Sequence, residues 1–584
     1  MSSEHHDIYL RAHTVQLENK QRPEVRKDDE PKSPDYAIVF DCESRITTDL
    51  TLTFGFWRFC ELRNDRYVCM EEGIFHDDKG LNAQEFALLR DYAKRTKPNT
   101  ADDGSDRLRL YSRSKFVDEV FGMAIQAKAL IVCFNAGFDL SRLAVDWERA
   151  ENGGWSLILS QWRNLKTDEL EANKFFPRVV IKSLNSKTAI IHSTRAPMSE
   201  PGKKNKQVKL WPPARFLDVR TLLWALRNKS YSLKTACQEF KTEHQKLDHT
   251  PTGTITLKEI EYARNDVACT VDMLNATKQE FDLHPIVPGP DRMFSPASMA
   301  KSYLEKLNIS HPSEKVRDAD EAYGIFMQSY FGGRAECRIR NWEVPVCPVD
   351  FMSQYSTVNE LLDNWSVLVA KHVTFPDATK DVRELLSQIT LERCFERKLW
   401  SRFRFFALVR PDNDILPVRT VYNGTTQNIG INYLTSEAPI WFAGPDIIAA
   451  ILLTGKVPRI ERAIRVVPHG KQAKLASTSL RGMVEVDANK KDSLFKHVVE
   501  QRAAHESNGA LHYWLKILAS SGSYGLFVEL NPNEFDETKL KVFSGEESFE
   551  TTSDIVEEPG KWFAPHIAAL ITAGGRLLLA MLEK

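Results

Sequence analysis

The sequence predicts an α/β domain followed by a second part of α+β character. Apolar strand segments, the first ending at Phe40, alternate with amphipathic helical segments over about residues 35–285. A long segment with helical apolar spacing, residues 256–281, closes that region. Beyond it, strands and helices no longer alternate regularly. Because 584 residues are too many for one hydrophobic core, we expect several domains.

The composition is that of an ordinary globular protein, with 42% hydrophobic and 27% charged residues. The net charge of −1 provides no overall positive field, so nucleic-acid binding must use local basic patches, such as residues 393–406 and 459–474. We find no run of about 18 apolar residues, which predicts no membrane span. The nine cysteines include no C-x-x-C pair and the N-terminus is unlike a secretory signal, so we expect reduced, cytoplasmic thiols.

The α/β region follows a polar, highly charged segment, residues 1–34, which we expect to be a flexible arm. A strand begins at Tyr36, and alternating apolar residues predict that its neighbours follow directly. The expected elements are strands at 36–40, 51–62 and 66–70, a helix at 113–129, strands at 129–134, 178–184 and 188–194, a strand end with two helices over 216–240, and the helix at 256–281. A proline-rich stretch from residue 286 predicts a linker that leads to a glycine-containing motif, over 286–340.

The second part mixes helices with shorter strand-like runs. The expected elements are helices at 298–307 and 319–330, a strand at 345–351, strand-like runs within 401–480, and helices at 491–519 and 563–583. No internal repeat accompanies them. This part therefore needs at least one hydrophobic core of its own.

Carboxylates follow two of the predicted strands. Asp41 and Glu43 lie two residues apart at the end of the first strand, so their side chains share one face of the sheet. Asp139 follows another apolar strand, at the edge where open α/β sheets gather their ligands. Tyr262 and Asp266 are four residues apart on the long helix and share one face of it. Each pattern alone is more typical of a solvated strand end, a capped turn or a surface helix, but all three in one domain favour a metal site with oxygen ligands.

This order of motifs, D-x-E, N-x-x-F-D and Y-x-x-x-D, resembles the 3′–5′ exonucleases of the DEDD superfamily, in the variety that carries the tyrosine. The resemblance implies a ribonuclease-H-like fold over residues 35–285 and hydrolysis of phosphodiester bonds at DNA 3′ ends. It also implies two Mg²⁺ or Mn²⁺ ions, which stabilise the attacking and leaving oxygens. Tyr262 would help to orient the attacking water, and Asn135 and Phe138 would contact the single strand. The implied metal ligands are Asp41, Glu43, Asp139 and Asp266.

Two motifs in the second half resemble those of family B DNA polymerases. SYFGGR at 329–334 resembles the Y-x-G-G motif, whose glycines let the backbone approach a template strand. DFMSQYSTV at 350–358 resembles polymerase motif A, with Asp350 as a metal ligand and Tyr355 under the sugar of the incoming nucleotide. The alternative for this segment is an ordinary strand end with a core tyrosine. The DNA-binding residues implied in the first motif are Tyr330, Gly332, Gly333 and Arg334.

A third segment, LKILASSGSYGLFVE at 515–529, resembles polymerase motif B. Lys516 would contact the triphosphate of the incoming nucleotide, and Tyr524 and Gly525 the nascent base pair. The segment departs from the family pattern because Ser520 replaces an asparagine and one extra residue precedes the tyrosine. The alternative is an amphipathic helix that ends in a glycine-rich turn.

The sequence contains no D-T-D motif, which supplies the second metal carboxylate of the family as motif C. The resemblance implies a palm with motif A and an insertion (341–490), fingers with motif B (491–530) and a return to the palm (531–584). We therefore expect a polymerase-like protein that is truncated or split before motif C and does not synthesise DNA alone. A second polypeptide would supply motif C and the thumb. The implied partners are a single-stranded DNA 3′ end, a primer-template and, for a competent polymerase, deoxynucleotides.

Two other functions remain open. One is a stand-alone DNA exonuclease that uses the polymerase remnant as a DNA-binding platform. The other is a non-catalytic protein that binds nucleic acid or a protein partner. Weak metal binding at the exonuclease motifs would favour the second.

Overall fold

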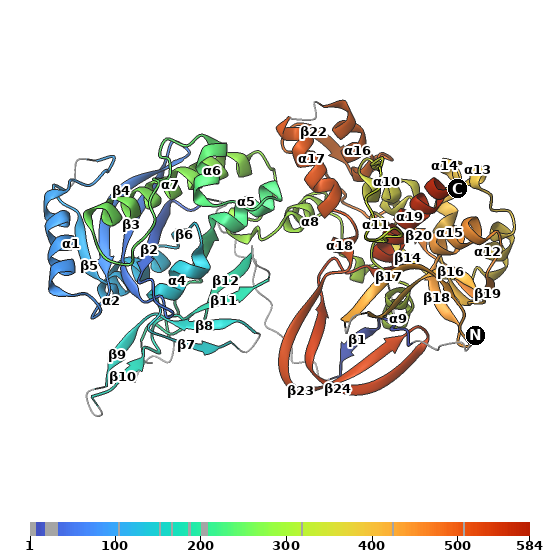
Figure 1. The fold of residues 1–584 in the computed structure, drawn as a ribbon, viewed down its shortest axis with the longest axis horizontal. Coiled ribbons are helices and arrows are strands. Elements are labelled where there is room, and N and C mark those ends of the chain that lie inside the picture. The colour runs from blue at the N-terminus through green and yellow to red at the C-terminus, as the bar shows by residue number, and fades with distance from the viewer. Residues whose placement is uncertain are drawn as a thin grey trace. The chain divides into compact units, whose positions relative to one another are not determined.

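The computed structural model describes residues 7–17, 33–102, 105–150, 153–164, 168–184, 188–199, 208–316, 319–422, 425–505 and 509–584. These residues form a mixed α/β protein with several sheets, whose elements are labelled in Figure 1. The chain divides into two compact units. We call them the central-sheet unit (Arg26–Met299) and the C-terminal unit (Met1–Val25 with Ala300–Lys584).

Most of the strands and helices expected before residue 285 are present in the central-sheet unit. Its strands are β2 (Tyr36–Ser44), β3 (Leu52–Arg63), β4 (Arg66–His76), β5 (Arg109–Ser112), β6 (Leu130–Cys133), β7 (Asp146–Arg149), β8 (Trp155–Ile158), β9 (Gln161–Arg163), β10 (Leu170–Ala172), β11 (Val179–Ser183), β12 (Ala189–Ser193) and β13 (Arg215–Asp218). Its helices are α1 (Ala83–Arg95), α2 (Arg113–Lys115), η1 (Phe116–Phe121), α3 (Gly122–Gln126), α4 (Ala136–Leu143), α5 (Val219–Arg227), α6 (Leu233–Phe240), α7 (Leu257–Asp282) and η2 (Pro290–Arg292). The predicted long helix at 256–281 is confirmed as α7, which begins where the Thr256 side chain accepts a hydrogen bond from the Glu259 backbone N–H at 3.2 Å.

A six-stranded sheet lies at the centre of this unit, with the strand order β13-β6-β2-β3-β4-β5. Strands β2, β3 and β4 form an antiparallel meander. By contrast, β6 runs parallel to β2, and β13 runs parallel to β6. The carboxyl ends of β2, β6 and β13 therefore meet at one edge of the sheet, where loops and helix starts can bring polar side chains together.

Alternation along β2 sends two kinds of side chain to opposite faces of this sheet. Phe40 and Cys42 belong to the buried apolar core. Asp41 and Glu43 have the opposite parity and point to the other face. Helix α7 packs across β2, β3 and β4, and its Asp266 interacts electrostatically with both carboxylates. The helix therefore covers the face that carries the charges (Figure 1).

The segment after residue 285, expected as a linker, belongs largely to the central-sheet unit up to Met299. Arg215 at the start of β13 donates hydrogen bonds of 3.1 and 2.7 Å to Asp291, and both side chains are buried. Met293 is buried as well. A desolvated, bidentate ion pair holds this segment against the sheet, which the composition of the segment did not indicate.

The C-terminal unit contains several small sheets and a set of packed helices. Its strands are β1 (His13–Gln16), β14 (His372–Thr374), β15 (Phe405–Arg410), β16 (Asp414–Tyr422), β17 (Thr425–Leu434), β18 (Ile440–Ala443), β19 (Arg459–Arg465), β20 (Val467–His469), β21 (Ser477–Leu480), β22 (Val484–Asp487), β23 (Leu530–Ser544) and β24 (Glu547–Pro559). Its helices are α8 (Pro296–Lys306, which begins before the division), η3 (Pro312–Glu314), α9 (Ala319–Gln328), α10 (Gln354–Leu361), α11 (Asn364–Leu368), α12 (Thr379–Leu386), α13 (Leu391–Cys394), α14 (Arg397–Trp400), η4 (Ser401–Phe403), α15 (Gly444–Thr454), α16 (Leu494–Ala504), α17 (Ala510–Ser521), α18 (Tyr524–Phe527) and α19 (Pro565–Glu583).

Part of the expected flexible arm is an ordered strand, so that expectation is wrong for residues 13–16. β1 pairs antiparallel with β23, in the sheet order β1-β23-β24. His13 is only 5% exposed, and its ring lies 5.4 Å from that of Tyr323 and 5.9 Å from that of Phe563. Burial of these side chains and the strand ladder offset the entropy that is lost on ordering the segment. Most of the remaining arm lies outside the described residues.

Helix α19 is largely buried in the C-terminal unit. It is long and apolar enough to cross a membrane, which corrects our expectation of no such run, but 78% of its apolar stretch is buried inside the protein, as in a core helix. Arg576 on this helix, 2% exposed, donates hydrogen bonds of 2.7 and 2.8 Å to Asp446 of α15. It also donates to the carbonyl oxygens of Phe331, at 3.1 Å, and Gly332. The helix thereby ties α15 to the segment that follows α9.

The strand expected at 345–351 is absent, which corrects the sequence prediction for motif A. Pro345 and Pro348 lack the backbone N–H that a strand ladder needs, and this segment pairs with none of the described strands. Val346 within this segment and Trp342 just before it are each 81% exposed. Tyr355 consequently lies on helix α10 instead of on a strand.

We expect the Asp446→Asn substitution to lower the free energy of unfolding by about 3–5 kcal/mol, because it leaves the Arg576 guanidinium buried without its counter-charge. Urea denaturation followed by circular dichroism measures this loss. The control is Asp492→Asn, which removes an exposed ion pair with Lys496 and should leave the midpoint almost unchanged. An Asp446→Asn midpoint equal to that of the wild type would contradict the role assigned to this pair.

Candidate active site

The structure brings together all five residues of the predicted exonuclease motifs at the carboxyl edge of β2 and β6. Asp41 and Glu43 end β2, and Asp139 lies in the first turn of α4, directly after β6. Tyr262 and Asp266 share one face of α7. The charge of Asp266 acts on Asp41 and Glu43, and that of Asp41 acts on Asp139, so the four carboxylates form one electrostatic cluster.

Two oxygens of this cluster are buried without a hydrogen-bond partner among the described residues. Asp139 is 1% exposed, and its Oδ1 accepts a hydrogen bond of 3.1 Å from the Cys42 backbone N–H, whereas its Oδ2 has no partner. Asp266 is 4% exposed, and its Oδ2 accepts from the Lys246 ammonium, whereas its Oδ1 has no partner. Buried polar atoms are normally satisfied, so this pair of oxygens is suited to a ligand outside the chain.

The cluster is difficult to ionise fully. Burial, followed by the charge of Asp266, raises the pKa of Asp41 to about 7. Burial and the charges of Asp41 and Asp266 raise the pKa of Glu43 to about 9. Burial and Asp41 also raise the pKa of Asp139 well above its usual range, and burial raises the pKa of Asp266 despite Lys246. A bound cation would relieve both the desolvation and the repulsion.

Sequence reasoning missed Lys246, which lies in the loop before α7. Its ammonium donates to Asp266 and lies 4.6 Å from the centre of the Tyr262 ring. Burial alone would lower the pKa of Lys246, but Asp266 and Tyr262 raise it, so this side chain stays charged. No local pattern marks a lysine in a loop as part of a site, because the contact depends on how the loop folds back over the helix.

Sequence reasoning also missed Asp218, the last residue of β13. Burial raises its pKa to about 6, although the Thr221 hydroxyl, at 2.8 Å, and the Arg220 backbone N–H, at 3.1 Å, stabilise its charged form. It acts electrostatically on Asp139. The signal that could have revealed it is a carboxylate directly after an apolar strand, the same signal that identified Asp41.

The carboxylates fit hard divalent cations such as Mg²⁺ or Mn²⁺, which prefer oxygen ligands. Among the described residues, however, no three His, Cys, Asp or Glu side chains are already arranged as one metal cluster. Lys246 occupies one oxygen of Asp266. Binding of cations therefore requires these side chains to shift, with the two unpartnered oxygens as the first available ligands.

Asn135 and Phe138 flank Asp139 on the exposed side of α4. Asn135 occupies the N-cap position but its side chain makes no capping hydrogen bond, and it is exposed. Phe138 is half-buried beneath the Arg142 guanidinium, which lies 5.2 Å from the ring centre. An exposed amide and an accessible ring can contact a single strand, and that role stays a prediction.

In the C-terminal unit, tyrosines from the three polymerase-like motifs lie together. The rings of Tyr355 and Tyr524 are 4.9 Å apart at an angle of 70°. Tyr330 is buried, and burial, with smaller contributions from Tyr524 and Tyr355, raises its pKa to about 12. A Cβ atom at Gly333 would lie 3.1 Å from the Tyr355 hydroxyl, so a glycine leaves room for this approach. Three segments that are far apart in sequence therefore converge.

Unlike the tyrosines, the charged residues of these motifs do not form one cluster. Asp350 lies in an exposed loop. The Arg334 side chain, 6% exposed, donates hydrogen bonds of 2.8 Å to Glu336 and 2.6 Å to Glu583, so a phosphate would have to displace these carboxylates. The carbonyl oxygen of Gly332 accepts a hydrogen bond from the Arg576 guanidinium, as described above.

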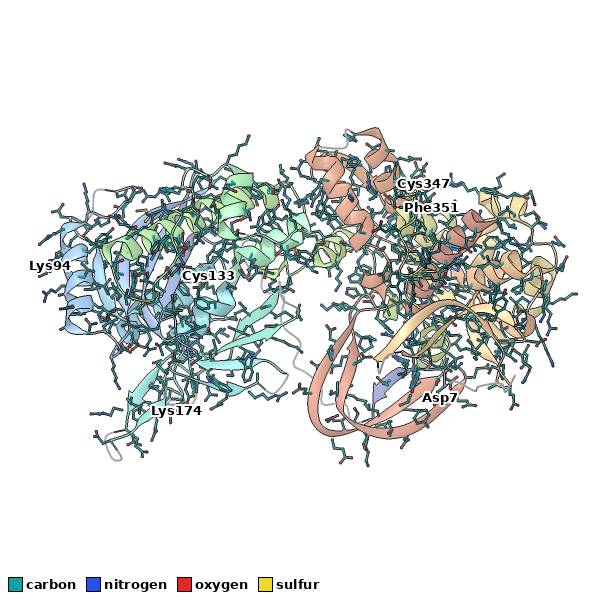
Figure 2. All side chains as sticks on the ribbon, in the orientation of Figure 1. Asp7, Lys94, Cys133, Lys174, Cys347 and Phe351 are labelled. Atoms are coloured by element: carbon teal, nitrogen blue, oxygen red, sulfur yellow. The ribbon has the colours of Figure 1, made fainter. Side chains whose placement is uncertain are left out.

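The helical structure expected over 491–519 is present as α16 and α17, and α17 continues through Ser521, while the assignment to motif B stays a prediction. Lys516 is exposed on this helix, and Gly525 is exposed in α18. The Ser356 hydroxyl donates a hydrogen bond of 3.2 Å to the carbonyl oxygen of Ala519, which joins the motif A and motif B helices. The side chains of this unit are drawn in Figure 2, where the loop before α10 is marked by Cys347 and Phe351.

Comparisons with known proteins show a resemblance at the level of structure. No model of a known protein family matches the chain, and no curated protein matches it in sequence. Among solved structures, the chain is similar to phi29 DNA polymerase complexed with single-stranded DNA, at 12% identity and a TM-score of 0.41. The match covers 94% of this chain and 77% of that one.

Thermal stability should depend on pH through the cluster. Because folding raises the pKa of Asp41 and Glu43, the folded state binds more protons than the unfolded state between about pH 4 and pH 9. Their contribution to stability is therefore complete below about pH 4 and is lost as the pH rises through 7 towards 9. The Tm of the Asp41→Asn/Glu43→Gln double variant minus that of the wild type should increase by at least about 2 °C when the pH is raised from 5.5 to 8.5. Both proteins are measured without divalent cations.

The control for this prediction is Asp248→Asn, which changes an exposed carboxylate that pairs with Lys234 at 2.5 Å. Its Tm should follow that of the wild type at both pH values. A double variant whose Tm keeps the same pH dependence as the wild type would show that the two carboxylates ionise normally.

Proposed function

We propose that the central-sheet unit hydrolyses single-stranded DNA from its 3′ end with two divalent cations. The observation that carries this proposal is the pair of buried, unpartnered oxygens, Oδ2 of Asp139 and Oδ1 of Asp266, within a cluster of mutually repelling carboxylates. The strand order β4-β3-β2-β6-β13, an antiparallel meander followed by two parallel strands, supports a ribonuclease-H-like arrangement. The residues that would hold the cations are Asp41, Glu43, Asp139 and Asp266.

When bound, the cations would lower the pKa of a coordinated water and stabilise the attacking and leaving oxygens of an in-line displacement. Tyr262 keeps its proton at neutral pH because burial raises its pKa, so its hydroxyl can donate a hydrogen bond that positions the water. Lys246 places a fixed positive charge beside Asp266 and Tyr262, which offsets part of the negative charge that a phosphodiester brings. Asn135 and Phe138 are the residues available to orient the strand.

Purified protein should release mononucleotides from a single-stranded oligonucleotide in the presence of Mg²⁺ or Mn²⁺. The Asp41→Ala/Glu43→Ala double variant should lose at least about a thousandfold in rate, equivalent to about 4 kcal/mol of transition-state stabilisation, because half of the ligand set is removed. Tyr262→Phe should lose on the order of a hundredfold, the range of a positioned proton donor. Oligonucleotides labelled at the 5′ end, resolved by length, report both the rate and the polarity.

Asp248→Asn again serves as the matched control, since it changes an exposed carboxylate that pairs with Lys234. Its rate should equal that of the wild type. The proposal fails if the Asp41→Ala/Glu43→Ala variant degrades DNA as fast as the wild type, or if shortening starts at the 5′ end.

The convergence of Tyr330, Gly333, Tyr355 and Tyr524 favours a second function for the C-terminal unit, a primer-template or nucleotide-binding centre of polymerase type. Asp350, exposed in its loop, would be the metal ligand of such a centre. Across the described residues, no cluster of three His, Cys, Asp or Glu side chains accompanies it. A second polypeptide that carries the missing carboxylate would complete the centre.

We therefore expect no primer extension by this chain alone. Nucleotide addition needs more than one carboxylate to hold the metal pair. The assay extends a primed template with four deoxynucleotides and uses the Asp41→Ala/Glu43→Ala variant, so that degradation cannot mask synthesis. Robust extension would mean that another carboxylate of this chain pairs with Asp350.

A further inference from the structure

A small void lies in the core of the C-terminal unit at the N-terminal end of α19. Its volume is about 10 Å³, close to the room that one water-sized particle needs. Most of its wall is apolar, and Lys315 and His566 are its charged or polar side chains. The apolar wall consists of Pro312, Val316, Val367, Leu368, Val373 and Ile567.

Among the described residues, no carboxylate pairs with the Lys315 ammonium at this void. The residue is 4% exposed, and its Nζ donates to the carbonyl oxygen of Leu368. Within the part of the chain that the structure describes, Lys315 forms no ion pair with a carboxylate. The neighbouring Glu314 has a side chain that is 61% exposed and pairs with His311. Burial accordingly lowers the pKa of Lys315 to about 7.

His566 turns a second polar side chain towards the same space. It is 1% exposed, and neither ring nitrogen has a hydrogen-bond partner among the described residues. Its ring lies 5.4 Å from that of Phe326 and 5.6 Å from that of Phe375. Burial lowers its pKa to about 3, so the ring is neutral and carries one N–H donor.

The void also faces the positive end of a long helix. His566 and Ile567 lie in the first turn of the 19-residue helix α19, and Ala564 at its N-cap provides no side-chain acceptor. Pro565 has no N–H, and the Ile567 and Ala568 N–H groups donate to the carbonyl oxygen of Ala564 at 2.9 and 3.2 Å, so this helix end favours an anion through its dipole. The Lys315 ammonium, the His566 ring N–H and the N-terminal end of α19 therefore create a positive electrostatic potential in a void with room for one small ion or water molecule.

We propose that this void binds a single monatomic anion, chloride in ordinary solution, held by the Lys315 ammonium, the His566 ring N–H and the N-terminus of α19. A water molecule would fill the space but would leave the ammonium uncompensated. The anion would join the turn around Lys315, the end of α11 at Leu368 and α19, the helix that presents Arg576 to the segment after α9. This site is independent of both functions proposed above.

The test measures the Tm of the full chain in sodium chloride and in sodium gluconate of equal ionic strength at pH 6.0, where an amine with a pKa of about 7 is charged. Chloride should raise the Tm by about 3 °C when it is tenfold above its Kd. Bromide should do the same, and sulfate should not, because it is too large for the void. The Lys315→Met variant should lose the difference between chloride and gluconate.

The matched control is Lys278→Met, which changes another buried lysine, one that already pairs with Asp65 and Asp282. This variant should keep the full chloride effect. Equal wild-type Tm values in chloride and gluconate would overturn the proposal, and so would an unchanged chloride effect in Lys315→Met. If Lys315→Met does not fold, bromide-soaked crystals of the wild type decide: an anomalous peak between Lys315 and His566 supports the site, and its absence refutes it.

Discussion

Uncompensated negative charge at the carboxyl edge of the central sheet is the constraint on which the central-sheet unit depends. Burial raises the pKa of Asp41 to about 7 and that of Glu43 to about 9, and the charge of Asp41 makes its neighbours harder to ionise. A fold keeps such a cluster only where packing elsewhere offsets the cost. On the other face of β2 lies an aromatic core in which the Phe75 and Phe116 rings stack 4.3 Å apart, and Phe40 and Cys42 of the strand belong to this core.

Buried charge is treated differently outside this edge. Glu72 is 2% exposed, and burial alone would raise its pKa, but hydrogen bonds and ion pairs with Arg264 and Arg58 outweigh burial and lower it. Asp446 likewise has its guanidinium partner on α19. Glu72 and Asp446 are thus paired with arginine, whereas among the described residues the cluster at β2 has the ammonium of Lys246. That contrast supports our proposal that the cluster at β2 binds a ligand.

The sheet order explains how distant segments supply this cluster. Because β2, β6 and β13 are parallel, the carboxylates that follow them reach the same edge, and α7 adds its own from one face. In the C-terminal unit, α19 has the corresponding role. Its Arg576 holds the backbone at Phe331 and Gly332, beside the tyrosines of the polymerase-like motifs. In both units, one long helix fixes residues that come from separate parts of the chain.

The sequence by itself determined the features that depend on short-range spacing. Asp41 and Glu43 share a face because strand side chains alternate, Tyr262 and Asp266 share a face because a helix repeats every 3.6 residues, and Asp139 follows an apolar strand. Only the tertiary structure decided the features that depend on distant partners. Lys246 reaches Asp266 through a folded loop, and Arg334 pairs with Glu583, 249 residues away. The segments at 13–16 and 345–351 show the physical reason most directly: a strand exists only where a second strand completes its hydrogen bonds, so β23 orders the first, and the second, interrupted by prolines, stays without a ladder.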